Sequence, residues 1–224
     1  QEAYDKFANG QIQQLFDEYN FDVGLSAVQW SNAVISGGDS ITKTKQGWSK
    51  LKTERYPGKQ DDICFINEKE GWYVNGYGKI FHTRDGGLSW EKQLEKKGSF
   101  FRCIAFLDSL RGFAGTVGTD YFPNVSDTIP LYGTVDGGKT WKKVYQSNRP
   151  FEGTWKASFP TKDVGYVTIQ SYNPDPNVKQ QRIAKTTDGG NTWNEINLVE
   201  DAGAREFGIG FIDENHGFVG TMNS

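Results

Sequence analysis

One stretch of the sequence occurs three times, and this repetition limits the possible folds more than any other feature. The copies read K-I-F-H-T-R-D-G-G-L-S-W at residues 79–90, P-L-Y-G-T-V-D-G-G-K-T-W at 130–141 and R-I-A-K-T-T-D-G-G-N-T-W at 182–193. Asp136 follows Asp85 by 51 residues, and Asp188 follows Asp136 by 52. A period of this length indicates one supersecondary unit used several times.

Each copy has the composition of a β-hairpin. An aliphatic residue and a threonine fit a short alternating strand, and Asp-Gly-Gly fits a tight turn because glycine accepts positive φ at little cost. A hydroxyl residue and a tryptophan then open the returning strand, and we expect the tryptophans to pack between neighbouring units. The residues assigned this structural role are Asp85, Gly86, Trp90, Asp136, Gly137, Trp141, Asp188, Gly189 and Trp193.

The aspartates are predicted to be structural. Asp85, Asp136 and Asp188 occupy equivalent turns in separate units. They therefore cannot converge on one substrate as a pair of catalytic carboxyl groups does. No catalytic residue is assigned.

Strands predicted around each hairpin complete a four-stranded unit. A strand beginning with glycine and an aromatic residue precedes each copy, and an apolar strand precedes that one. The predicted units span residues 21–56, 61–95, 100–147, 152–199 and, incompletely, 205–224, after a lead-in at 1–20 that could form a short helix. The unit at 21–56 carries Lys45-Gln46-Gly47 in place of Asp-Gly-Gly.

The skeleton S/T-x-D-x-G-x-T/S-W resembles the Asp-box, or BNR, repeat of sialidases, xyloglucanases, sortilin-type receptors and the photosystem II stability and assembly factor family. The second glycine and the glycine-aromatic strand make it most similar to the last of these. The resemblance implies an all-β fold, a β-propeller of four-stranded antiparallel blades, with seven blades in the ring. About four and a half blades would leave an open edge and an apolar face, so we expect this chain to be the N-terminal portion of a longer propeller.

Charge and composition exclude some classes of partner. The formal net charge is -3, which argues against a nucleic-acid or anionic membrane surface, and no apolar run is long enough to insert into a bilayer. The chain begins with Gln1 rather than Met, so an upstream segment could have been removed. We expect an exported protein, secreted, periplasmic or on the cell surface.

The cysteines and histidines give no sign of a metal or cofactor site. Aligned repeats place Cys64 and Cys103 on inner strands with sulfurs pointing the same way round the ring, which favours two separate buried thiols over a disulfide. His82 and His216 belong to different units and have no third ligand nearby. No metal or cofactor is assigned.

Binding residues are predicted on the face opposite the Asp-Gly-Gly turns. Long connections at residues 118–127 and 171–177 emerge there, and Asp61, Arg102, Trp155 and Phe207 start the inner strands at matching positions. Exposed aromatics with mixed charge suit a polypeptide or a glycan. The alternative, that the loops only cover blade edges, has equal weight. The candidate binding residues are Asp61, Arg102, Asp120, Tyr121, Phe122, Trp155, Tyr172, Asp175 and Arg205.

Three functions fit these features. The first is a non-catalytic binding or assembly module that recognises a protein or glycan through the channel mouth and the long loops. The second is a sialidase-like or xyloglucanase-like glycoside hydrolase with catalytic groups partly outside this segment. Against it, a sialidase carries an Arg-Ile-Pro element, whereas Arg182-Ile183 is followed here by Ala184. The third is a structural adhesion or surface-display module.

Overall fold

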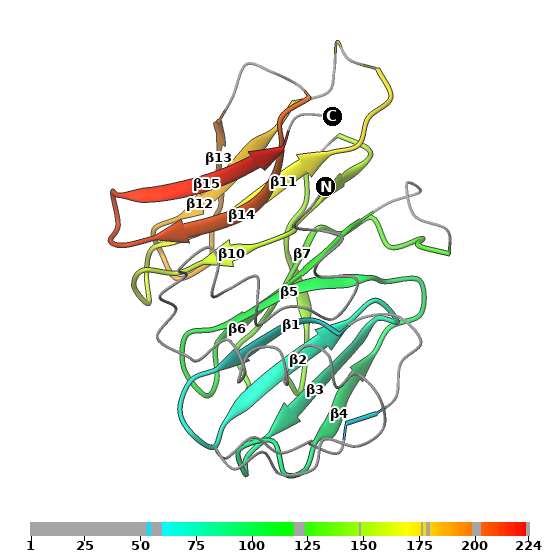
Figure 1. Cartoon of the computed structure of the whole chain (residues 1–224), viewed down its shortest axis with the longest axis vertical. Helices are drawn as coiled ribbons and strands as arrows, with labels where there is room; N and C mark the ends of the chain where they lie inside the picture. Colours follow the sequence, from blue (N-terminus) through cyan, green and yellow to red (C-terminus); the bar gives the residue numbers. More distant parts are fainter. Residues whose placement is uncertain are drawn as a thin grey trace, which may run out of the picture. The chain divides into compact units, whose positions relative to one another are not determined.

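The computed structural model describes residues 53–54, 60–118, 124–147, 149–175, 177, 180–198 and 203–222, all within the compact unit Lys52–Ser224 (Figure 1). The predicted lead-in (1–20), nearly all of the predicted unit 21–56, and Asp120, Tyr121 and Phe122 lie outside the described residues. Every regular element in the described part of the chain is a β-strand.

Two complete four-stranded sheets come first. The first sheet has the order β1-β2-β3-β4, with β1 (Gln60–Phe65), β2 (Gly71–Asn75), β3 (Lys79–Thr83) and β4 (Glu91–Glu95). The second has the order β5-β6-β7-β8, with β5 (Phe101–Phe106), β6 (Gly112–Thr116), β7 (Leu131–Thr134) and β8 (Lys142–Tyr145). All neighbouring strands are antiparallel.

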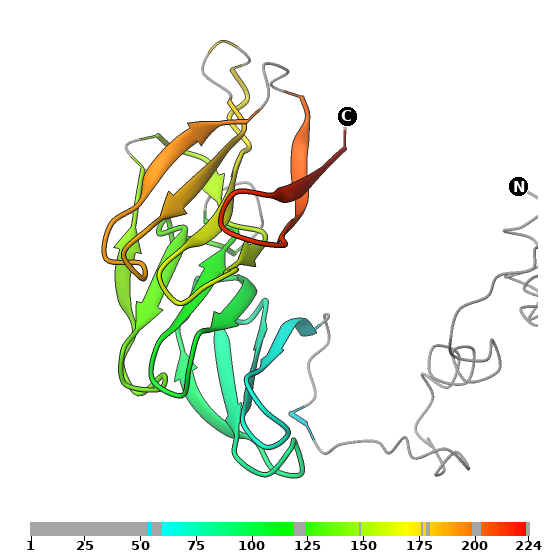
Figure 2. The ribbon, with the colours of Figure 1, turned by 90° about the vertical axis from the view of Figure 1, so that its left-hand side faces the viewer.

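A third sheet and a two-stranded sheet follow. The third has the order β10-β11-β12-β13, and β9 pairs with the far end of β11. Its strands are β9 (Glu152–Gly153), β10 (Ala157–Ser158), β11 (Gly165–Ser171), β12 (Arg182–Thr186) and β13 (Asn194–Asn197). The final pair is β14 (Arg205–Phe211) with β15 (Gly217–Met222). The predicted all-β fold of four-stranded antiparallel units is confirmed, and Figure 2 shows the sheets following one another.

Aromatic stacks join each sheet to the next. The residue after the first glycine of a second strand stacks on a phenylalanine at the end of the next sheet's inner strand. The pairs, with centroid distances and interplanar angles, are Trp72–Phe106 (3.5 Å, 4°), Phe113–Phe159 (4.9 Å, 12°) and Tyr166–Phe211 (3.5 Å, 3°). These stacks bury aromatic surface between sheets. Each pair adds about 0.5–1.5 kcal/mol to the stability beyond the contribution of the buried area.

The glycine of the glycine-aromatic motif makes room for these rings. A Cβ atom on Gly112 would lie 2.6 Å from the Phe106 ring, and one on Gly165 would lie 2.1 Å from Phe159. Such distances are far inside van der Waals contact. Each stacked phenylalanine is therefore held between a glycine of its own sheet and an aromatic ring of the preceding one.

The Asp-Gly-Gly turns repeat the same hydrogen bonds. In the second sheet, the Thr134 hydroxyl donates to Asp136 Oδ1 (2.8 Å), the Thr140 N–H donates to the same oxygen (2.9 Å), and the Thr140 hydroxyl donates to Oδ2 (2.6 Å). Gly138 has a φ of 86°. Equivalent bonds surround Asp85 and Asp188. Each carboxylate thus closes a turn in its own sheet.

The tryptophans of these turns contact the stacked rings from the side and are not part of the stacks. Trp141 meets Phe106 edge-on at 6.0 Å, and Trp193 meets both Phe113 (5.7 Å) and Phe159 (6.2 Å). Among the described residues, Trp90 makes its ring contacts within its own sheet, to Phe65 and Tyr73. Trp193 therefore packs on the preceding sheet as predicted, whereas the ring contacts of Trp90 stay within its own sheet. The glycine-aromatic residue makes the principal contact between sheets.

We predict that Asp136→Asn lowers the melting temperature at neutral pH, because the amide loses the charge and one of the acceptors that hold the turn. Hydrogen bonds from Thr140 lower the pKa of the Asp136 carboxyl from 3.8 to about 2. The stability it provides is therefore complete above about pH 4 and is lost as the pH falls toward 2.

Thermal unfolding followed by circular dichroism across this pH range tests the prediction. The difference between wild type and Asp136→Asn should shrink as the pH falls. Glu91→Gln, at a solvent-exposed position on β4, is the matched control and should melt like the wild type. Equal melting of Asp136→Asn and wild type at neutral pH would contradict the structural role.

Candidate functional site

The inner strands deviate from regular pairing at matching positions. Register shifts place Asp61, Arg102 and Phe207 between successive ladder pairs on β1, β5 and β14. Such β-bulges redirect a side chain away from the regular alternation. Three of the four positions picked out by aligning the repeats therefore have the same local backbone irregularity.

The fourth position, Trp155, lies outside the regular strand pairing for a different reason. The prediction placed it at the start of a continuous inner strand, but the structure divides that strand into β9 and β10, with Trp155 between them. The backbone N–H groups of Trp155 and Lys156 each donate to Thr168 Oγ1 at 3.1 Å. A threonine hydroxyl thus replaces the missing ladder bonds and frees the Trp155 side chain.

These four side chains touch in sequence order, and we call Asp61, Arg102, Trp155 and Phe207 the bulge row. Arg102 Nη1 lies 2.7 Å from Asp61 Oδ1, and the Arg102 guanidinium lies 4.3 Å from the centroid of the Trp155 ring. The rings of Trp155 and Phe207 are 5.0 Å apart at 70°. Asp61, Arg102 and Phe207 come from β1, β5 and β14, and Trp155 comes from the segment between β9 and β10, so the bulge row is a continuous strip across all four described sheets.

Three hydrogen-bond donors along the strip have no partner among the described residues. They are Arg102 Nε, Trp155 Nε1 and Thr154 Oγ1, and all three are buried. A buried donor left unpaired costs about 1–3 kcal/mol, so such groups are expected to be rare in a folded protein. A bound molecule that presents acceptor oxygens would satisfy them.

The other predicted binding residues divide into two groups. Arg205 lies beside the strip, with its guanidinium 5.5 Å from the Tyr172 ring. Tyr172 lies 6.4 Å from Trp155, but it is only 7% exposed and its hydroxyl donates to Gln170 Oε1. The expectation of an exposed Tyr172 is therefore wrong. Asp175 accepts a hydrogen bond from the Asn177 N–H and serves a turn in its loop.

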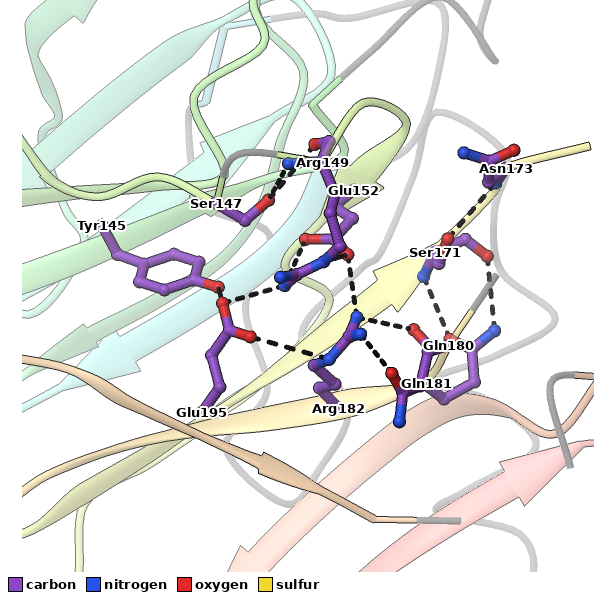
Figure 3. Close-up of polar contacts among 10 residues, drawn as sticks. All are labelled: Tyr145, Ser147, Arg149, Glu152, Ser171, Asn173, Gln180, Gln181, Arg182 and Glu195. Atoms are coloured by element: carbon purple, nitrogen blue, oxygen red, sulfur yellow. Dashed lines mark hydrogen bonds and ion pairs between the residues drawn. The ribbon is translucent and has the colours of Figure 1, made fainter. Parts of the chain in front are cut away.

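A cluster of two arginines and two glutamates was not predicted (Figure 3). Arg149 binds Glu152 (2.6 Å) and Glu195 (2.8 Å), and Arg182 approaches the same two carboxylates at 3.2 and 3.6 Å. The Tyr145 hydroxyl donates to Glu195 at 2.5 Å. Arg182 stands where the other copies have Lys79 and Pro130, and Glu195 stands where they have Lys92 and Lys143, so the repeats gave no signal of the cluster.

The cluster fastens the second sheet to the third. Tyr145 belongs to β8, while Glu152, Arg182 and Glu195 belong to β9, β12 and β13. Burial alone would raise the pKa of Glu195, but hydrogen bonds from Arg149 and Tyr145 hold this pKa below its usual value. The charges balance within the cluster, so it acts as an internal clamp.

Glu206 is a buried acid next to this clamp. Its side chain is 0% exposed, and neither carboxyl oxygen has a hydrogen-bond partner within the described ranges. Burial raises the pKa of Glu206 to about 9, with the nearby Glu152 raising it further and Arg182 opposing. Glu206 is therefore uncharged at neutral pH.

The histidines and thiols have structural surroundings. His82 is buried on β3 and stacks on Trp72 at 4.4 Å, and burial lowers the pKa of its imidazole. Cys64 and Cys103 are free thiols as predicted, and burial raises the pKa of Cys103 to about 12. Within the described ranges, no three His, Cys, Asp or Glu side chains gather closely enough to hold a metal ion. None of the described residues form a helix that could cross a membrane.

Repeated four-stranded antiparallel sheets with their first strands innermost define a β-propeller. No protein-family model and no curated protein matches the chain. Among solved structures, an ancestral GH74 enzyme matches with 11% identity and a TM-score of 0.57, covering 72% of this chain and 22% of that one. This likeness supports the propeller fold.

Two structures of YCF48 also match. YCF48 from Cyanidioschyzon merolae has 18% identity and a TM-score of 0.49, covering 70% of this chain and 49% of that one. YCF48 bound to D1 peptide has 16% identity and a TM-score of 0.45, covering 69% and 60%. This chain thus spans three fifths or less of the YCF48 chains it matches.

We predict that Glu206 makes the protein less stable as the pH rises. The folded-state pKa of about 9 exceeds the ordinary 4.5, so the folded state keeps a proton that the unfolded state loses. Stability should fall between these pH values, with the unfolding equilibrium constant rising at most about tenfold per pH unit.

Glu206→Gln should remove this slope, since the amide resembles the protonated acid, and the variant should match the wild type near pH 5 but exceed it near pH 9. Denaturant unfolding at a series of pH values measures the difference. Glu91→Gln serves as the control at an exposed glutamate. An unchanged slope in Glu206→Gln would show that Glu206 is not the buried acid responsible.

Proposed function

We propose that this chain is a non-catalytic, exported β-propeller module that binds a polypeptide segment along the bulge row. The observation that carries the proposal is the set of buried donors on Arg102, Trp155 and Thr154 that have no partner in the described part of the chain. They lie along a strip that also offers apolar area on Trp155 and Phe207. Donors beside aromatic surface are the usual composition of a recognition site.

A polypeptide fits these groups better than a glycan does. An extended main chain presents a carbonyl oxygen at every residue, and carbonyl oxygens are good acceptors for the Arg102 and Trp155 N–H groups. Arg102 already covers a face of the Trp155 ring at 4.3 Å, which leaves less of it for a sugar to stack on. The pairing with Asp61 also neutralises Arg102, so uncharged acceptors suffice.

The glycoside hydrolase alternative rests on Tyr145 and Glu195, which form a hydrogen-bonded pair beside two arginines. These residues lie on the outermost strands β8 and β13, away from the inner strands. Glycoside hydrolysis requires a protonated and an ionised carboxyl group flanking the substrate. The protonated group here, Glu206, has no exposed surface. These features favour the binding proposal.

We predict that Trp155→Phe weakens peptide binding without destabilising the protein. The substitution keeps an aromatic ring but removes an N–H for which the described residues supply no partner. Loss of one hydrogen bond should raise Kd about threefold to tenfold. A synthetic peptide array identifies a binding sequence, and titration calorimetry compares the variants.

Trp193→Phe is the matched control, because Trp193 Nε1 already donates to the Gly190 carbonyl oxygen at 3.1 Å. This variant should lose stability and keep its peptide affinity. Unaltered peptide binding in Trp155→Phe would overturn the proposed site. Release of reducing sugar from a glycoside, abolished by Glu195→Gln, would favour the hydrolase instead.

A further inference from the structure

The outer edge of β8 carries a cavity separate from the bulge row. β8 (Lys142–Tyr145) is the last strand of its sheet and, in the described part of the chain, pairs only with β7. A cavity of about 690 Å³ is lined by the consecutive residues 143–147. An edge strand offers unpaired N–H and C=O groups to any strand that can approach it.

One wall of the cavity is held by contacts within the protein. Arg149, Phe151 and Glu152 line it, and the arginine–glutamate clamp fixes Arg149 and Glu152. Phe151 has a φ of 64°, a left-handed conformation that is costly for a bulky residue, and its carbonyl oxygen accepts from the Tyr172 N–H at 2.7 Å. Because this wall is already ordered, binding against it costs little further ordering.

The charge on this edge is positive and uncompensated. Residues 137–147 contain Lys139, Lys142 and Lys143 but no acidic residue. Lys143 Nζ donates to Gln146 Oε1 at 2.9 Å, and none of the three lysines forms an ion pair with a described residue. On the other outer strands, Lys92 of β4 pairs with Glu95 and Glu195 of β13 pairs with Arg149.

We propose that the β8 edge binds an acidic, extended peptide as an added antiparallel or parallel strand. Main-chain hydrogen bonds to β8 would supply affinity, and Asp or Glu side chains of the peptide would pair with Lys142 and Lys143. Lysines on an edge oppose pairing with neutral or basic strands, so the same residues select the acidic occupant. The site is independent of the bulge row.

The test uses a blocked synthetic peptide of Val and Glu in which the glutamates come in adjacent pairs, so that an added strand presents one to each face, titrated into the whole chain. Binding should weaken with added salt, and Lys142→Glu with Lys143→Glu should raise Kd at least about tenfold. Lys92→Glu is the matched control, because Lys92 holds the register position on β4 that Lys143 holds on β8. This control should bind the peptide normally.

Two further measurements separate strand addition from simple charge attraction. The same peptide N-methylated at alternate residues should not bind, because its main chain cannot complete the ladder. Trp155→Phe should leave binding unchanged. Three results would each overturn the proposal: no binding of the Val-Glu peptide, equal binding of the N-methylated peptide, or loss of binding in Trp155→Phe. Circular dichroism confirms that the lysine variants are folded.

Discussion

The stack of a phenylalanine between a glycine and an aromatic ring holds the sheets of this protein together. Trp72 covers Phe106, and Tyr166 covers Phe211, with ring centroids 3.5 Å apart in both pairs. The glycine behind each ring is required because a Cβ atom would overlap it. The tryptophans of the Asp-Gly-Gly turns reinforce these contacts from the side, while the turns themselves are closed by aspartate.

The candidate binding residues lie where the inner strands deviate from regular pairing. The stacks and turns fix each sheet near the far ends of its inner strand, and the bulges occur near the start of the strand. There Asp61, Arg102 and Phe207 leave the ladder, and Thr168 supplies the bonds that free Trp155. The resulting strip has donors that the residues described by the structure do not satisfy.

The repeats allowed much of the fold to be predicted, because residues in equivalent positions have equivalent neighbours. The hairpins, the turn aspartates and the matching positions of the bulge row follow from that alignment. The burial of Tyr172 could not be predicted from the alignment, because the composition of its long loop suggested exposure. In the structure, the Tyr172 main chain is hydrogen-bonded to Phe151. The clamp of Arg149, Glu152 and Glu195 was also missed, because non-repeating charges give no periodic signal.

The bulge has a consequence for how such a protein can diversify. A residue outside the ladder and outside the stacks is not fixed by strand pairing, and the same register position is occupied here by Asp, Arg and Phe. Substitutions at these positions can change the chemistry of the inner surface while the glycine-aromatic framework stays as it is. Recognition could therefore drift from one ligand to another through lineages that share a single architecture.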